Sequence, residues 1–312
     1  MAEPLMMWVY LIVAAAVAIP LVIEVTRRRM NDSARENAPG QSVRLSQGVT
    51  HYQWRGPENG PVAVCIHGLT TPSFVWQGVV AGLVRLGFRV LTYDLYGRGW
   101  SDRPWGSQNA EFFNRQLSDL LDNQQVEDDV TLIGYSMGGA IAAAFAARRP
   151  LAIRQVILIA PAGLRDIDLS GFKKLLQLPV IGTWLMLLFY PGQLRKGIKA
   201  ESGLASSVEN VSGRQEAELD WKGFVPAVAS SLRGIISEDL EAAHATLQQD
   251  GVPVLAIWGG QDEVIPLTSS DRLGDWNPTA QSVVVAEGGH GIPYTHTSEV
   301  LDHIARFTSR NG

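Results

Sequence analysis

The stretch Gly134-Tyr135-Ser136-Met137-Gly138-Gly139 gives the clearest structural signal in this chain of 312 residues. It joins a short apolar run, 129–134, to an alanine-rich run, 138–148, and so predicts a sharp turn from a strand into a helix. A serine on such a turn has a strained backbone, and glycines two residues before and after it meet the steric demand. The helix that follows also points its first backbone N–H groups toward the serine. The pattern is typical of a nucleophilic serine, although an idle serine on a glycine-rich turn would have the same sequence.

A serine hydroxyl becomes a good nucleophile when a base removes its proton and a carboxylate holds that base. Both residue types follow Ser136 on loops after predicted strands. Asp262 comes after the apolar run 254–258, and His290 stands among glycines after the run 282–286. We therefore predict Ser136, Asp262 and His290 as the catalytic residues.

The neighbours of these residues are expected to have other roles. Glu263 is adjacent to Asp262, but successive side chains of an extended chain point apart, which predicts a solvated or structural carboxylate. The remaining histidines lack a comparable loop context and are expected to be ordinary surface or core residues: His51, His244, His296 and His303.

An ester carbonyl that is attacked by serine becomes an oxyanion, which needs two hydrogen-bond donors. One predicted donor is the N–H of Met137, the residue after the nucleophile. The other is expected in the turn after the apolar run 62–66, where we assign the N–H of Leu69. His67, just before it, is expected to hold this loop by hydrogen bonds.

Strands and helices alternate through most of the chain, which predicts an α/β fold with a mostly parallel sheet and helices on both faces. A hairpin is expected at 43–55, broken at Gly48. The further predicted strands are 62–66, 88–93, 129–134, 155–160, 252–258 and 282–286, with helices at 75–86, 111–122, 138–148 and 300–307. The rhythm breaks in 161–245, which we interpret as a helical cap between two parts of the core, 43–160 and 246–312.

From about residue 43 onward the sequence resembles the α/β-hydrolase superfamily. The order Ser136, Asp262, His290 is the order of that superfamily. The run 94–101, Asp-Leu-Tyr-Gly-Arg-Gly-Trp-Ser, is similar to the D-x-x-G-x-G-x-S turn of its esterase, C–C hydrolase and haloperoxidase branches. Serine at the turn argues against the haloalkane dehalogenase and epoxide hydrolase branches, which use aspartate. Among the serine branches the chain resembles membrane-anchored monoacylglycerol lipases and carboxylesterases.

The N-terminal segment 1–29 is predicted to be a transmembrane anchor. Residues 5–23 carry no charge, and as a helix they are long enough to cross a hydrocarbon core of about 30 Å. Arg27, Arg28 and Arg29 follow, so the positive-inside rule predicts a single-pass protein with its N-terminus outside and its catalytic domain in the cytoplasm. A cleavable signal peptide would have a basic region before the apolar run, and there is none. The polar segment 30–42 is expected to be a linker.

Composition excludes several classes of partner. The net charge is −5 and there is no long basic run, so no nucleic-acid partner is expected. A single cysteine, Cys65, excludes intrachain disulfides and multi-thiolate metal sites. No cofactor or metal is expected, because no cluster of ligand residues has suitable spacing on one element.

The only local clue to the substrate is an apolar stretch in the predicted cap, 172–190, with basic residues at both ends. Such a stretch could accept an acyl chain near lipid, or could simply pack on the edge of the sheet. We predict a serine hydrolase that cleaves carboxylic esters through an acyl-enzyme, acting on lipid-like esters such as monoacylglycerols. The alternatives are a C–C bond hydrolase of vinylogous diketones and a non-catalytic membrane-tethered binding protein.

Overall fold

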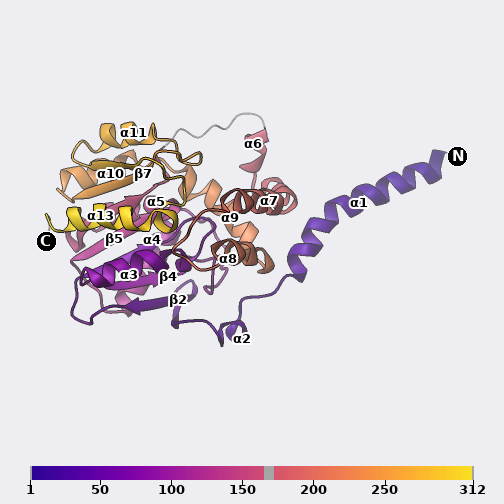
Figure 1. The fold of residues 1–312 in the computed structure, drawn as a ribbon. Coiled ribbons are helices and arrows are strands. Elements are labelled where there is room, and N and C mark those ends of the chain that lie inside the picture. The colour runs from indigo at the N-terminus through magenta and orange to yellow at the C-terminus, as the bar shows by residue number, and fades with distance from the viewer. Residues whose placement is uncertain (1, 165–171, 311–312) are drawn as a thin grey trace.

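The computed structural model describes residues 2–164 and 172–310, and its centre is one eight-stranded sheet (Figure 1). The strand order is β1-β2-β4-β3-β5-β6-β7-β8, with β1 and β2 antiparallel and the strands from β3 to β8 parallel to one another. The strands are β1 (Gln41–Leu45), β2 (Gly48–Arg55), β3 (Val62–Ile66), β4 (Arg89–Tyr93), β5 (Val130–Tyr135), β6 (Ile153–Ile159), β7 (Val254–Gly259) and β8 (Gln281–Val285). The predicted mostly parallel sheet is confirmed.

Helices cover both faces of this sheet. One layer is formed by α3 (Gln77–Arg85) and α13 (Thr297–Thr308), whose buried side chains share a cluster with β3 and β7. The other layer is formed by α4 (Ala110–Asn123), α5 (Met137–Arg148), α10 (Glu241–Gln249) and α11 (Ser269–Trp276). Every residue of β5 is buried between the layers, which explains its almost continuous apolar sequence.

The segment 161–245, which we interpret as the cap, contains helices but no strand in its described part after β6. After β6 the chain forms α6 (Phe172–Leu176), α7 (Pro179–Glu201), α8 (Val211–Ala217) and α9 (Phe224–Arg233), and α10 begins at the end of the cap. Residues 165–171 lie outside the described part of the chain. Figure 1 shows α7, α8 and α9 together at the end of the sheet nearest to α1. Residues of α7 and α9 form an apolar cluster of their own, which includes Met186, Leu187, Phe224, Val225 and Val228.

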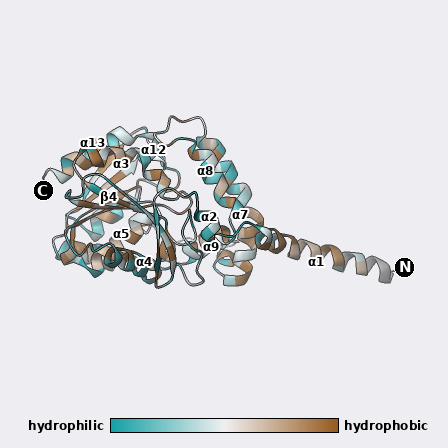
Figure 2. Ribbon diagram, turned by 90° about the horizontal axis from the view of Figure 1, so that it is seen from below, coloured by the Kyte–Doolittle hydropathy of each residue, from teal (hydrophilic) through white to brown (hydrophobic). Residues whose placement is uncertain are grey.

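The C-terminal end of helix α1 (Ala2–Thr26) lies beside the rest of the molecule, and its N-terminal part projects away from it (Figure 1). Figure 2 shows apolar residues along most of its length. Its part Met6–Thr26 is long and apolar enough to cross a membrane, judged by length and composition within the described residues. One helix of this kind is compatible with a membrane span.

The segment 30–42 differs from the free linker that its polar sequence suggests. It contains a short helix, α2 (Asp32–Arg35), and the Arg35 side chain donates a hydrogen bond of 2.8 Å to the carbonyl of Trp100. Arg35 also pairs with Asp102. The segment therefore packs on the core, because a charged side chain within it finds partners on a distant loop.

Candidate active site

Ser136 lies on the turn between β5 and α5, where its backbone has φ 53° and ψ −119°. Residues other than glycine rarely adopt this backbone conformation. The packing around Ser136 must therefore offset the free-energy cost of the strained backbone. A Cβ atom on Gly134 would lie 2.3 Å from the carbonyl oxygen of Gly138, and one on Gly138 would lie 2.0 Å from that of Ile66. Both positions need glycine because backbone meets backbone there.

The structure brings together the three residues predicted from the sequence. Ser136 Oγ lies 3.0 Å from Nε2 of His290, and Nδ1 of His290 lies 2.8 Å from Oδ2 of Asp262. In the tautomer with a proton on Nδ1, His290 donates to the carboxylate and accepts the serine proton at Nε2. The three residues follow β5, β7 and β8, whose carboxyl ends meet at one edge of the sheet.

The carboxylate of Asp262 is fixed on both of its oxygens. Oδ1 accepts hydrogen bonds of 2.8 Å from the N–H groups of Val264 and Ile265, while Oδ2 faces His290. Glu263 next to it is exposed, in agreement with the solvated position expected for it. Only one of the two adjacent carboxylates can therefore orient the imidazole.

The imidazole is also restrained from the side of the sheet. The rings of Tyr135 and His290 have centroids 5.3 Å apart and an interplanar angle of 36°. Tyr135 in turn forms a T-shaped pair with Trp76, with ring centroids 6.4 Å apart. This stack limits rotation of His290 out of hydrogen-bond reach of Ser136.

The two predicted oxyanion donors, the N–H groups of Leu69 and Met137, belong to segments that lie beside Ser136. A Cβ on Gly68 would be 3.3 Å from Cβ of Ser136, so the loop that carries Leu69 lies against the serine. Met137 is the first residue of α5 and its N–H has no acceptor inside the helix. Within the described chain, neither the Leu69 N–H nor the Met137 N–H donates a hydrogen bond. Their role as oxyanion donors stays a prediction.

His67 holds the loop that carries Leu69, as expected. Its Nδ1 lies 2.8 Å from the carbonyl of Gly68, and its Nε2 accepts a hydrogen bond of 2.8 Å from the N–H of Leu95. Complete burial lowers the pKa of His67 to about 4. A neutral ring with one donor and one acceptor nitrogen fits this pair of contacts.

Arg98 is a residue of this site that the sequence analysis passed over. It is fully buried, and its Nε donates to the carbonyl of Leu69 at 3.0 Å. Its Nη2 donates to Oγ of Ser231 on α9 at 2.8 Å, so one guanidinium joins the loop beside Ser136 to the cap. Burial lowers its pKa to about 9, which still leaves it charged at neutral pH. In the sequence Arg98 stands between two glycines of the run 94–101, a position that does not indicate burial.

Asp94 organises the same run without contacting the reacting groups. Its carboxylate accepts hydrogen bonds from the N–H groups of Ser73 and Trp100, at 2.9 Å each, and faces Nδ1 of His51 at 2.9 Å. Burial opposes the charge, but the hydrogen bond and the charge of His51 hold the pKa of Asp94 well below its usual range. His51 is thus a core residue, one of the two roles expected for it.

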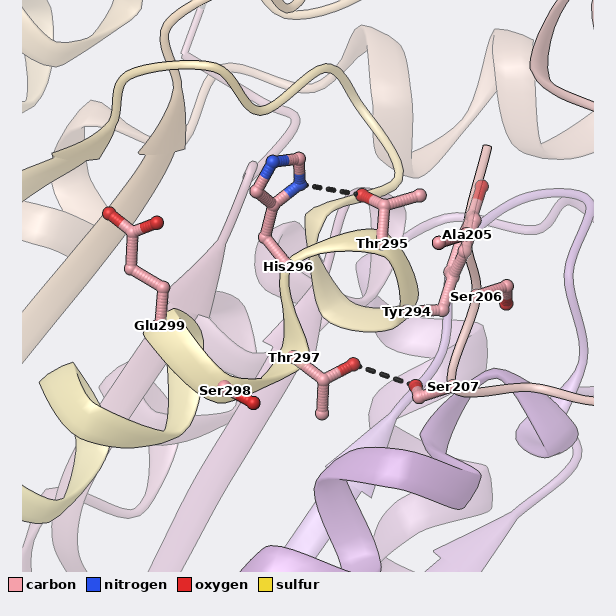
Figure 3. A pocket seen from close by; sticks show the side chains of 9 residues that line it. All are labelled: Ala205, Ser206, Ser207, Tyr294, Thr295, His296, Thr297, Ser298 and Glu299. Carbon is pink, nitrogen blue, oxygen red and sulfur yellow. Dashed lines mark hydrogen bonds between the residues drawn. The ribbon is translucent and has the colours of Figure 1, made fainter. Parts of the chain in front are cut away.

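Beyond His290 the helix α12 (Ile292–Thr295) fastens the cap to the core. The hydroxyl of Tyr294 donates to Glu201 at the end of α7 at 2.8 Å, and the N–H of Ser207 donates to the Tyr294 carbonyl at 2.8 Å. Figure 3 shows a pocket at this joint, where Thr297 faces Ser207 and Thr295 faces His296. Ser136, Asp262 and His290 are not among its lining residues.

Metal ligation finds no support in the described residues, which contain no group of three or more His, Cys, Asp or Glu side chains that could hold an ion. The arrangement at Ser136 is instead suited to covalent catalysis by a hydroxyl, with proton transfer through an imidazole.

The chain is similar to several known proteins. The family model described as the alpha/beta hydrolase fold matches residues 61–297. The 2-hydroxymuconate semialdehyde hydrolase of Pseudomonas sp. (strain CF600) is 29% identical over 246 residues, which cover 76% of this chain and 79% of that protein. Lipase 1 of Psychrobacter immobilis is 26% identical over 271 residues, 81% of this chain and 79% of the lipase. The crystal structure of a membrane phospholipase A, a bacterial virulence factor, superposes with a TM-score of 0.69 and 21% identity, covering 100% of this chain and 99% of its own.

Proposed function

The chain belongs to the alpha/beta hydrolase family, and from this premise we propose that it is a membrane-anchored serine hydrolase that cleaves carboxylic esters through an acyl-enzyme. The observation that carries the proposal is the hydrogen-bonded line from Ser136 through His290 to Asp262. A serine on a strained turn, a base within reach and a fixed carboxylate are the parts that acyl transfer requires.

In this mechanism Ser136 Oγ attacks the ester carbonyl while Nε2 of His290 takes its proton. The N–H groups of Leu69 and Met137 stabilise the oxyanion, and Asp262 stabilises the imidazolium. His290 then protonates the departing alcohol, which leaves the acyl group on Ser136. A water molecule, deprotonated by His290, releases the acid and restores the serine.

Lipid-like esters, such as monoacylglycerols, are the substrates that we propose. Leu69 packs against the apolar cluster of the cap, so apolar side chains begin directly beside the predicted oxyanion donor. An acyl chain attached to a carbonyl at Ser136 would find an apolar environment there. The similarity to Lipase 1 and to the membrane phospholipase A supports the same class.

Membrane anchoring through α1 completes the proposal. The stretch Met6–Thr26 is followed by Arg27, Arg28 and Arg29, which would place the catalytic domain in the cytoplasm by the positive-inside rule. The superposition with the membrane phospholipase A covers the whole chain, α1 included, which supports an anchoring role for this helix.

The test is hydrolysis by the full chain in mixed micelles, wild type beside Ser136→Ala, with esters from acetyl to oleoyl and with monoacylglycerols. We expect Ser136→Ala to lose activity by about 1,000-fold or more, because the remaining donors and binding groups give only residual catalysis. Its thermal unfolding should be unchanged. Full activity of Ser136→Ala, or no reaction of the folded wild type with a fluorophosphonate, would contradict the serine mechanism and favour a binding protein.

A second candidate is a C–C bond hydrolase, because the relative at 29% identity is a 2-hydroxymuconate semialdehyde hydrolase. The same three residues could serve that reaction. A dienone diketone in the substrate panel separates the two candidates: turnover confined to the diketone would replace ester hydrolysis as the function.

A further inference from the structure

The helix α1 contacts the cap in the middle of its apolar stretch. The indole N–H of Trp184, on α7, donates a hydrogen bond of 2.9 Å to the carbonyl oxygen of Val17. Pro20 has no N–H, so the carbonyl of Ala16, directly before Val17, has no helical donor in this turn. Among the described side chains of α1, only Pro20 and Glu24 are buried, and they lie one turn apart on one face. That face is the one that α1 turns toward the cap.

The C-terminal end of α1 and the residues directly after it make further contacts with the cap. Oε1 of Glu24 accepts a hydrogen bond of 2.6 Å from the N–H of Gly223. The Lys222 N–H donates to the carbonyl of Arg28 at 2.8 Å, and the Arg28 guanidinium lies 4.4 Å from the centroid of the Trp221 ring. With Trp184, these contacts hold α1 against the cap at several points, so the depth of α1 in a membrane sets the depth of α7.

That depth follows from helix geometry. Val17 precedes Thr26, the last residue of α1, by nine positions, which corresponds to about 13.5 Å at a rise of 1.5 Å per residue. Half of a hydrocarbon core is about 15 Å. If Thr26 lies at the edge of the core, Trp184 therefore lies well inside one leaflet, near the middle of the bilayer.

The composition of α7 fits immersion at this depth. No charged residue occurs between Lys174 and Arg195. Val180 is 81% exposed and Ile181 is 50% exposed, while Met186 and Leu187 on the inner side are buried in the cap cluster. A helix that is apolar on both sides is typical of a lipid-facing element. The polar and basic part of α7 begins only in its second half, with the basic residues Arg195, Lys196 and Lys199.

We propose that the first half of α7 is immersed in the leaflet on the side of the catalytic domain, beside α1, and that acyl chains reach Ser136 from within this leaflet. The partner of this surface is the lipid bilayer. The inference rests on the proposed anchoring of α1 and deepens the proposed function, since it makes a membrane-resident lipid ester the substrate. The basic second half of α7 would then lie at the level of anionic headgroups.

The test places one fluorescent probe at a time on the full chain in vesicles of phosphatidylcholine and phosphatidylglycerol. The native Cys65 is buried and burial raises its pKa, so it should not react with the label. Val180→Cys reports on α7, Tyr10→Cys on α1, and Leu151→Cys, 99% exposed beside β6, is the water-facing control. Each labelled protein is also reacted with a fluorophosphonate to show that Ser136 is folded and reactive.

We expect the probe at position 180 to be quenched by lipids that carry a nitroxide on the acyl chain, as at position 10, and to be shielded from iodide. The probe at position 151 should show the opposite pattern. Lipid quenching at position 10 with a water-exposed probe at position 180 would overturn the inference and leave the anchor intact. Water exposure at both positions would contradict the anchoring itself, and loss of the fluorophosphonate reaction in wild type would contradict the serine mechanism separately.

Discussion

The turn at Ser136 and the cap above it are held in place by different kinds of contact. At the turn, backbone packs on backbone through a glycine at position 138. In the cap, polar side chains reach across to the core: Arg98 binds Ser231, 133 positions away, and Glu218 accepts the N–H of a residue 119 positions away. The turn therefore leaves a pattern within a few residues of sequence, whereas the contacts of the cap leave none. The two regions should also respond differently to mutation.

Gly138→Ala should have the largest effect, because position 138 has no room for a side chain. The added Cβ would lie 2.0 Å from the carbonyl oxygen of Ile66, so the turn must shift and Ser136 should leave hydrogen-bond distance of His290. We expect kcat/KM for a soluble ester to fall by about 100-fold or more. Gly274→Ala on α11, where a Cβ meets nothing within 4 Å, is the matched control and should keep full activity.

Wild-type activity in Gly138→Ala would contradict the difference that we infer between the turn and the cap, because the turn would then tolerate an added methyl group as an exposed helix does.

Arg98→Lys should have an intermediate effect, because it weakens a contact between the regions and leaves each region intact. A lysine is a point charge and cannot bind the Leu69 carbonyl and Ser231 together. We expect kcat to fall by about tenfold with a smaller change in KM, since oxyanion donors act mainly in the transition state. Arg154→Lys, which alters an exposed pair with Asp129, is the control.

Both variants are assayed well below their unfolding temperatures. A purely structural role for Arg98 would lower the unfolding temperature and leave kcat of the folded protein unchanged.

The smallest effect concerns the pH dependence of stability. Glu218 is buried 3.9 Å from Arg103, and burial raises its pKa from 4.5 to about 7 although Arg103 opposes the shift. Between these pH values the folded protein retains a proton that the unfolded chain has lost. The contribution of Glu218 to the free energy of unfolding therefore falls as pH rises through this window and is constant above it.

Glu218→Gln should flatten this part of a plot of unfolding temperature against pH. The control is Glu216→Gln, which alters an exposed carboxylate paired with Arg195 and should keep the wild-type slope. Equal slopes in wild type and Glu218→Gln would mean that Glu218 is ionised throughout the window.

The strand segments, the mostly parallel sheet and the positions of the site residues could be predicted because they depend on local pattern. Each apolar run that was predicted to be a strand is a strand in the structure. Because β5, β7 and β8 are parallel, the loops after them lie at one edge of the sheet. This is why Ser136, Asp262 and His290 could be predicted to meet although up to 154 positions separate them. Their catalytic roles remain predictions for the experiments above.

Other features could not be predicted, because they depend on pairs of distant side chains. Arg98 lies between glycines in a run whose glycines explain the pattern, and nothing nearby indicates that its guanidinium is buried. The segment 30–42 has the composition of a linker, yet Arg35 binds residues 65 and 67 positions later. The predicted helix at 75–86 begins in the structure with a short 3-10 turn, Ser73–Trp76, before α3.

The contact between Glu24 and Gly223 can form only late during synthesis of the chain. These residues are 199 positions apart, and at about 5–20 residues per second the ribosome needs roughly 10–40 s to make the second after the first. During this interval the carboxylate of Glu24 can already pair with Arg27, the residue directly after α1, and the two groups lie 2.6 Å apart in the finished protein. Arg27 can therefore neutralise the charge of Glu24 before the cap is synthesised. When Gly223 is made, its N–H meets a carboxylate that is already paired.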